Sequence, residues 1–209
     1  MKVNSTVPTV VIKRLPRYYR YLSELLNRDV LRVSSAELSR KMGVTASQIR
    51  QDFNCFGDFG QQGYGYNVKH LHEQIGEILG MNRHYSLVII GAGNLGHALA
   101  NYAGIKKRGY RIIGIFDNDP EKIGKKINGI SVCDIAKLED FCQENIVDIA
   151  VLSIPKPEVK EITNRLINIG IKGLWNFSYA ELETPDDIFV ENVHLSDSLM
   201  RLSYKITQE

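Results

Sequence analysis

A glycine-rich turn directly after an apolar run is the part of this chain whose residue types best suit phosphate binding. Residues 88–90 are Val-Ile-Ile, and they lead into the pattern Gly91-x-Gly93-x-x-Gly96. This order predicts a strand, a sharp turn and a helix N-terminus, with which Rossmann domains hold the pyrophosphate of a dinucleotide. Gly91 would permit the turn, Gly93 would let backbone amides approach the phosphates, and Gly96 would allow close helix packing. We therefore expect the dinucleotide to contact six consecutive residues, Gly91, Ala92, Gly93, Asn94, Leu95 and Gly96.

An acidic residue stands at the end of the next predicted strand. Asp117 lies 21 residues beyond Gly96 and directly follows the apolar run 112–116. A carboxylate at this place can accept hydrogen bonds from both hydroxyls of the adenine ribose, which favours NAD(H) over NADP(H). The alternative interpretation is that Asp117 forms a turn or a helix cap before Asp119-Pro120.

The elements around these residues alternate between strands and helices. We predict strands over 86–90, 111–116, 149–154 and 173–177, and helices that begin near Asn94, Ala136 and Glu158. This alternation is typical of an α/β domain with a doubly wound parallel sheet of the Rossmann type, which we place over residues 82–192. The third strand ends in Ser153, Ile154 and Pro155, which either line the nucleotide crevice or form a plain strand-ending turn.

Short helices and tight turns are predicted for the first 80 residues. Leucines and tyrosines recur at helical spacing over residues 15–26, where Pro16 suits the first helical turn. The patterns Ser34-x-x-Glu37 and Thr45-x-x-Gln48 are both typical of a capping box, and Gly43 between them indicates the end of a helix. Two short helices joined in this way predict a helix-turn-helix.

The second helix of this motif would carry the residues that read DNA bases. Ile49 and Phe53 would face the core, which leaves Ser47, Arg50 and Gln51 on the outer face. In the major groove an arginine can bond a guanine and a glutamine can bond an adenine. This pattern indicates a recognition helix.

A glycine- and aromatic-rich segment and a local excess of positive charge support DNA binding. Positions 56–66 hold four glycines and four aromatic residues, Tyr64 among them, which predicts the hairpin of a winged helix over residues 1–81. Residues 1–80 contain eleven Lys/Arg against seven Asp/Glu, whereas the remainder contains fifteen against seventeen. We expect Lys13, Arg14 and Arg17 to contact phosphates. A three-helix domain that docks on another protein is the alternative.

Composition limits the other classes of function. The 209 residues suffice for two compact domains. The three cysteines lack metal-ligand spacing, and no apolar run reaches the length of a membrane span, so we expect a cytoplasmic protein without a metal. The five histidines have no evident acid or base partner, which favours a sensor over an enzyme. A small NAD-dependent oxidoreductase and a nucleotide- or CoA-binding module that docks on a protein remain alternatives.

The order and spacing of five blocks carry a family resemblance. The blocks lie at residues 9–20, 33–38, 49–52, 56–66 and 91–96. Together they resemble the Rex family of bacterial redox-sensing transcriptional repressors over essentially the whole chain. The resemblance implies a non-enzymatic repressor that binds double-stranded operator DNA as a homodimer, is released by NADH and binds NAD⁺ at the same site.

The resemblance also implies a route of communication between the domains. Residues 193–209 would form a helix exchanged between the two subunits, and Leu195, Leu199 and Leu202 would share one face of it. Arg20, Tyr102 and the partner's Asp197 would couple the nucleotide to DNA binding, and we expect Tyr102 to lie on the helix that begins at the glycine turn. Asn94, Gln51 and Ser198 stand where some members of the family have other residues. A dimer with two recognition helices predicts an operator with an inverted repeat.

Overall fold

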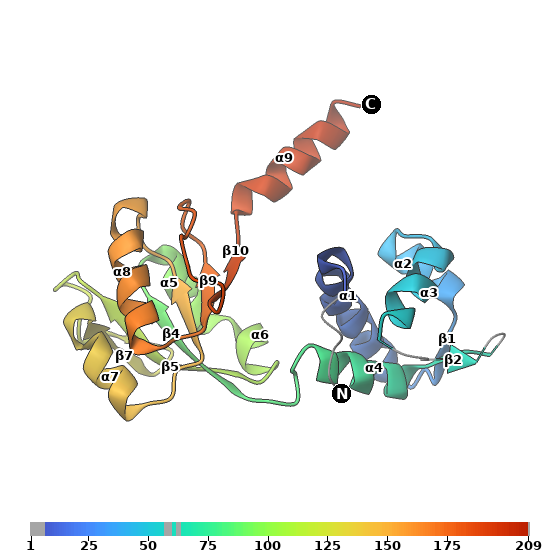
Figure 1. The fold of residues 1–209 in the computed structure, drawn as a ribbon, viewed down its shortest axis with the longest axis horizontal. Coiled ribbons are helices and arrows are strands. Elements are labelled where there is room, and N and C mark those ends of the chain that lie inside the picture. Colours follow the sequence, from blue (N-terminus) through green and yellow to red (C-terminus); the bar gives the residue numbers. More distant parts are fainter. Residues whose placement is uncertain (1–6, 57–59, 62–63, 209) are drawn as a thin grey trace. The chain divides into compact units, whose positions relative to one another are not determined.

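The computed structural model describes residues 7–56, 60–61 and 64–208 (Figure 1). These residues form two units, Met1–Arg83 and His84–Glu209. The division between the units lies two residues beyond the predicted boundary at 81/82. The tip of the predicted wing lies outside the described residues.

The N-terminal unit is a helix-turn-helix with a small antiparallel sheet in the order β1-β3-β2. Tyr18, Leu38, Ile49 and Phe53 are buried in its single apolar core. The elements of this unit are α1 (Thr9–Leu26), β1 (Arg32–Val33), α2 (Ser35–Met42), α3 (Ala46–Asn54), β2 (Gly60–Gln61), β3 (Gly65–Asn67) and α4 (Val68–Ile78). The hairpin of β2 and β3 is the predicted wing.

Caps define the two helices of the motif. The hydroxyl of Ser34 accepts from the backbone N–H of Glu37, and the Glu37 carboxylate accepts from the backbone N–H of Ser34, so the predicted capping box is confirmed. Helix α2 ends at Gly43, whose φ of 68° is the left-handed conformation that glycine adopts without strain. Thr45 caps α3 through the backbone N–H of Gln48, but the Gln48 side chain bonds elsewhere, so the second capping box is incomplete.

The predicted start of α1 is wrong. The helix begins at Thr9, so Pro16 lies in its interior rather than in its first turn. A proline there leaves the carbonyl of Ile12 without its helical partner, and both residues are exposed, so water can serve that carbonyl. Burial of Val11 and Leu15 in the core stabilises the additional turns.

The C-terminal unit contains a seven-stranded sheet in the order β10-β9-β8-β4-β5-β7-β6. All neighbouring strands are parallel except β6, which runs antiparallel to β7. The strands are β4 (Tyr85–Ile90), β5 (Tyr110–Asp117), β6 (Lys126–Ile127), β7 (Ile130–Asp134), β8 (Ile149–Leu152), β9 (Gly173–Asn176) and β10 (Phe189–Asn192). The four predicted strands are β4, β5, β8 and β9, and the α/β class with a doubly wound, mostly parallel sheet is confirmed.

Helices cover the sheet on both faces (Figure 1). One face packs against α7 (Leu138–Glu144), which follows a 3₁₀ turn at Ile135–Lys137, and against α8 (Lys156–Ile169). The opposite face packs against α5 (Asn94–Asn101) and α6 (Ala103–Lys106). Both helices of the second face, α5 and α6, belong to the connection from β4 to β5, so this face has less helical cover at the β9–β10 edge.

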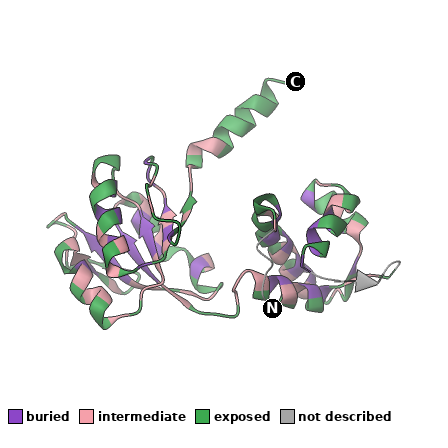
Figure 2. Ribbon diagram, viewed as in Figure 1, coloured by how far each residue is buried: buried purple, intermediate pink, exposed green. Residues whose placement is uncertain are grey.

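The last helix, α9 (Leu195–Ile206), has no buried residue (Figure 2). Its exposed large apolar side chains are Leu195, Leu199, Met200, Leu202, Tyr204 and Ile206. Isolated apolar residues on a surface are ordinary, but six exposed large apolar side chains on one helix indicate an interaction site.

Candidate functional site

The carboxyl ends of three strands meet at the glycine turn. The backbone N–H of Gly91, after β4, donates to the carbonyl of Phe116 in β5 at 2.8 Å, and that of Ser153, after β8, donates to the carbonyl of Ile90 at 2.9 Å. Strand β4 lies between β5 and β8, so the chain changes direction across the sheet at this point. Ligands of open α/β sheets bind at such a switch point.

The three glycines of the motif have different reasons to be glycine. Gly91 has a φ of 99°, and a Cβ there would lie 2.5 Å from the carbonyl oxygen of Ser153. A Cβ at Gly96 would overlap the carbonyl oxygen of Gly91, so α5 could not pack as closely. Gly93 has an ordinary φ of −73°, and among the described residues a Cβ there would meet no atom within 4 Å apart from its two chain neighbours. The fold therefore requires Gly91 and Gly96 but leaves open space beside Gly93.

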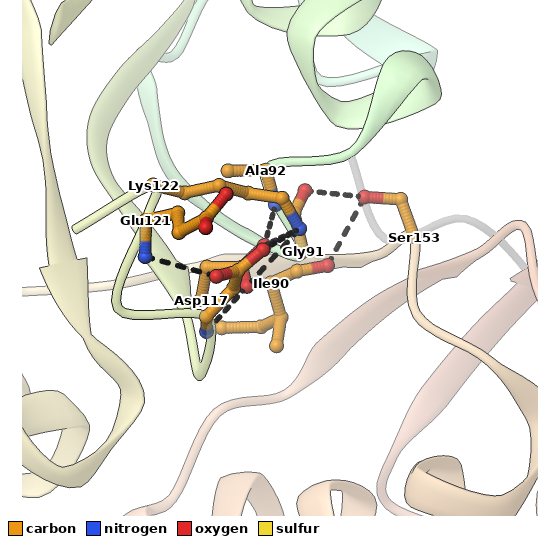
Figure 3. Close-up of polar contacts among 8 residues, drawn as sticks. Ile90, Gly91, Ala92, Asp117, Glu121, Lys122 and Ser153 are labelled. Carbon is orange, nitrogen blue, oxygen red and sulfur yellow. Dashed lines mark hydrogen bonds and ion pairs between the residues drawn. The ribbon is translucent and has the colours of Figure 1, made fainter. Parts of the chain in front are cut away.

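Asp117 is buried at the end of β5, and its carboxylate organises the neighbouring loops (Figure 3). One oxygen accepts from the backbone N–H of Ala92 at 2.7 Å, and the other accepts from the backbone N–H of Asp119 at 2.9 Å. The second bond is the turn that the alternative interpretation predicted. The Ala92 amide thus supports the Asp117 carboxylate, and contact of Ala92 with the dinucleotide stays a prediction.

Lys122 extends this cluster, although nothing in the sequence pattern singled it out. Its ammonium group lies 3.3 Å from carboxylate oxygens of both Asp117 and Asp119. Burial alone would lower the pKa of Lys122, but the hydrogen bonds to the two carboxylates outweigh burial and raise it. The Asp117 carboxylate predicted to bind the ribose is therefore already paired with the Lys122 ammonium group.

Ser153 ties β8 to the glycine turn. Its hydroxyl lies 3.0 Å from the carbonyl oxygen of Ile90 and 2.9 Å from that of Gly91, and dashed lines mark both bonds in Figure 3. A cavity of about 440 Å³ opens beside these residues. The residues of the predicted dinucleotide site that line this cavity are Gly91, Gly93, Asp117, Ser153, Ile154 and Pro155.

The remaining predicted residues lie at the start of α5. Asn94 is exposed, Leu95 is half-buried and Gly96 is buried, and none of the three lines the cavity. Their placement is that of a helix N-terminus, whose backbone amides and dipole favour an anion. Side chains of α8, including Glu158 in its first turn and Arg165 farther along it, line the cavity and had no signal in the sequence, because they belong to an ordinary amphipathic helix.

Helix α3 presents the residues predicted to read bases. Ser47, Arg50 and Gln51 are exposed, whereas Ile49 and Phe53 are buried, so the predicted inward and outward faces are confirmed. Arg50 donates through Nη1 to the Ser35 hydroxyl at 3.1 Å, which joins the recognition helix to the start of α2.

The predicted phosphate contacts divide into two kinds. Lys13 and Arg17 are exposed on α1 and remain available for phosphates. Arg14 does not match its predicted role, because its Nε and Nη2 bond the two carboxylate oxygens of the buried Asp52 at 2.7 and 2.6 Å. Sequence spacing could not reveal this pair, since its members lie 38 residues apart.

The wing residue Tyr64 is 71% exposed and is supported by Arg32 of β1. Arg32 Nη1 donates to the Tyr64 carbonyl at 3.1 Å, and the guanidinium carbon lies 6.0 Å from the centre of the Tyr64 ring. A cation near an aromatic face is attractive at this distance. Arg32 therefore adds an exposed positive charge at the base of the wing that sequence analysis missed.

The coupling residues implied by the family resemblance lie in three separate parts of the chain. Arg20 is exposed on α1, and Asp197 is in the first turn of α9. The predicted helical position of Tyr102 is wrong. Tyr102 lies in extended backbone between α5 and α6. It is 58% exposed, and its ring lies against Gly104, where a Cβ would approach ring carbons to 2.6 Å. Tyr102 is thus a surface residue at a break between helices.

A winged helix followed by a Rossmann domain defines a DNA-binding regulator with a nucleotide site. Two family models match, one described as a CoA binding domain over residues 82–180 and one as a putative DNA-binding protein N-terminus over residues 6–54. The redox-sensing transcriptional repressor Rex of Caldicellulosiruptor saccharolyticus is 53% identical over 97% of this chain and 93% of its own length. That of Clostridium perfringens is 54% identical over 98% of this chain and 96% of its own. The chain belongs to the Rex family of redox-sensing transcriptional repressors.

Solved structures agree over the same extent. The crystal structure of RSP, described as a Rex-family repressor, matches with a TM-score of 0.92 at 51% identity and covers 98% of this chain and 96% of its own. RSP in complex with β-NAD⁺ and operator DNA matches with a TM-score of 0.92 at 53% identity, covering 98% of this chain and 94% of that one. RSP with β-NADH matches with a TM-score of 0.91 at 50% identity, covering 98% and 96%.

These comparisons settle the class of function. The chain is a transcriptional repressor and not the small NAD-dependent oxidoreductase that the Rossmann motif alone left open. Within the described residues, no helix combines the length and apolar character needed to cross a membrane.

Proposed function

We propose that this repressor binds an inverted-repeat operator as a homodimer in the cytoplasm and that NADH, bound at the glycine turn, releases it. The observation that carries the nucleotide assignment is the open space at Gly93. The fold itself needs no glycine there, yet the position lies at the N-terminus of α5 and lines the cavity. A glycine that its own chain does not require is expected where a ligand approaches the backbone.

Residues in and beside the cavity fit two groups of an adenine dinucleotide, its pyrophosphate and its adenine ribose. The amides at the start of α5 suit a pyrophosphate, and Asp117 at the end of β5 suits a ribose diol. NADH and NAD⁺ share these groups, so both ligands should occupy the site. RSP, the related repressor, has been crystallised with either nucleotide.

Two apolar surfaces of the C-terminal unit support the proposed homodimer. A groove of about 730 Å³ lies where the sheet has less helical cover, and its lining includes Tyr102, Ile105, Trp175 and Phe189. Helix α9 exposes six large apolar side chains along its length. Burying four of them would contribute on the order of 6–12 kcal/mol before the entropic cost of association. A second copy of the chain supplies both surfaces, so we propose exchange of α9 over residues 193–209.

Release of DNA requires that the nucleotide distinguish two dimer states. Two recognition helices reach successive major grooves only when they lie about 34–36 Å apart. A ligand shifts this equilibrium only by its difference in affinity for the two states, so NADH must bind the free dimer more tightly than the DNA-bound dimer. Exposed Tyr102, which directly follows α5 and lines the groove, is suited to take part, together with Arg20 and the partner's Asp197.

Fluorescence anisotropy of a labelled inverted-repeat duplex tests this proposal. Wild-type protein should bind the duplex without nucleotide and with NAD⁺, and added NADH should release it. Asp117→Ala is the matched control, because it should bind the same duplex but require a higher NADH concentration for release. Release by NADH at unchanged concentration in Asp117→Ala would contradict the assigned ribose site, and no release from wild type would contradict the function.

A further inference from the structure

A buried charge lies on the recognition helix. Asp52, in α3, is fully buried, and it follows the exposed Arg50 and Gln51. Charged side chains are almost never fully buried unless they are paired. Asp52 therefore requires partners inside the core.

Four hydrogen bonds satisfy the Asp52 carboxylate. Arg14 bonds both oxygens, as described above, in a bidentate pair, and the Tyr18 hydroxyl donates to Oδ2 at 2.7 Å. Gln48, one turn earlier on α3, donates through Nε2 to Oδ1 at 3.1 Å. Burial by itself would raise the pKa of Asp52, but the bonds from Arg14, Tyr18 and Gln48 outweigh burial and lower it. The carboxylate is thus held ionised inside the core.

The bonds join the recognition helix to α1 at two points. Arg14 and Tyr18 are one helical turn apart on α1, so together they specify where along α1 the carboxylate sits. The Tyr18 ring also packs edge-on against Phe53, the next residue of α3, with ring centres 5.1 Å apart. Arginine–carboxylate forks have a fixed planar geometry, whereas apolar contacts are non-directional.

This directional contact has a consequence for DNA reading. Each residue of an α-helix is turned by about 100° from its neighbour, so a fixed direction at Asp52 also fixes the directions of Arg50 and Gln51. We propose that Asp52 is a positioning residue for operator recognition, which through Arg14 and Tyr18 sets how α3 is turned about its own axis. The proposal rests on α3 being the helix that reads bases.

A merely structural role for Asp52 would affect stability alone, so the test separates stability from selectivity. An operator duplex is first selected from a random pool with wild-type protein. The dissociation constants for that duplex and for a random duplex are then measured without nucleotide, well below the unfolding temperature of each variant. Asp52→Asn should lower the ratio of the two affinities by about 5- to 150-fold, the equivalent of one bidentate base contact. Random-duplex affinity should change by less than about threefold, because Lys13 and Arg17 stay in place.

A second variant keeps the test decisive when loss of one partner unfolds the domain. Arg14→Met/Tyr18→Phe/Asp52→Leu replaces the network with apolar side chains, and such replacements of buried ion pairs often preserve or raise stability. It should fold and bind random duplex, yet show the same loss of selectivity. Wild-type selectivity in this variant, or in folded Asp52→Asn, would overturn the proposal.

A matched control comes from the other unit. Glu139→Gln removes a comparable bidentate pair, in which Arg165 Nε and Nη2 bond the Glu139 carboxylate at 2.7 Å each. It should keep wild-type selectivity without nucleotide. Wild-type protein that does not distinguish the two duplexes would instead refute base reading by this chain, which is a separate failure.

Discussion

Substitution of the middle glycine of the turn separates ligand binding from folding. Gly93 has a φ of −73° and open space around its Cβ position, so alanine fits without strain. A compatible Gly→Ala change stabilises a protein by about 0.4–1 kcal/mol, because it reduces the freedom of the unfolded chain. For a unit of this size we expect Gly93→Ala to raise the unfolding temperature by about 1–4 °C.

The same methyl group should obstruct the pyrophosphate. Losing one hydrogen bond from a backbone amide to a charged oxygen costs about 1.5–3 kcal/mol. NADH should therefore bind Gly93→Ala about 10- to 150-fold more weakly. The free energy of NADH binding is measured by a titration monitored by fluorescence, and the unfolding temperature is measured by calorimetry on the same sample.

Gly96→Ala is the control with the opposite expectation. Its Cβ would overlap the carbonyl oxygen of Gly91, so this variant should lose stability as well as NADH binding. Unchanged NADH affinity in Gly93→Ala would refute the turn as the pyrophosphate site. A lowered unfolding temperature in that variant would refute the conformational argument.

Three further predictions concern DNA reading, coupling and pH. Arg50→Ala should cost about 1–3 kcal/mol on the operator and much less on a random duplex in a gel-shift assay, and equal losses would make Arg50 a phosphate contact. Tyr102→Phe should bind NADH within a few-fold of wild type, while NADH-driven release changes by about 1 kcal/mol or more. Unchanged release in both Tyr102→Phe and Asp197→Asn would exclude the coupling triad. The pKa of Asp52 lies below its ordinary 3.8, so its contribution to stability is complete above that pH and is lost as pH falls through the lower value. Urea unfolding should show a larger stability difference between wild type and Asp52→Asn at about pH 6 than at about pH 2, and an equal difference would contradict this account.

Local patterns predicted the parts of the fold that local interactions determine. The capping box at Ser34, the left-handed end of α2 at Gly43 and the apolar runs of β4 and β5 each depend on neighbouring residues. The outward face of α3 followed from helical spacing for the same reason. Strand β10 was not predicted, because its residues do not alternate between apolar and polar and are mostly exposed. Its pairing with β9 determines it.

Contacts between distant residues account for what the sequence could not reveal. Arg14 looked like a phosphate contact because its partner, Asp52, is on another helix. Tyr102 looked like a helical residue because no residue before it signals the end of a helix. In the structure, the side chain of Asn128, in the turn between β6 and β7, donates to the carbonyl of Ala100 at the end of α5, and this distant contact leaves no local pattern. The open space at Gly93 and the approach of Lys122 to Asp117 likewise depend on how the loops fold, which no local pattern determines.

The reciprocal effect of DNA on nucleotide affinity tests the central claim most directly. NADH is titrated by calorimetry into the free protein and into protein saturated with inverted-repeat operator duplex. Thermodynamic linkage requires that DNA weaken NADH binding by the same factor by which NADH weakens DNA binding, and we predict a factor of about 5–150. Equal NADH affinities in the two titrations would contradict control of operator binding by NADH.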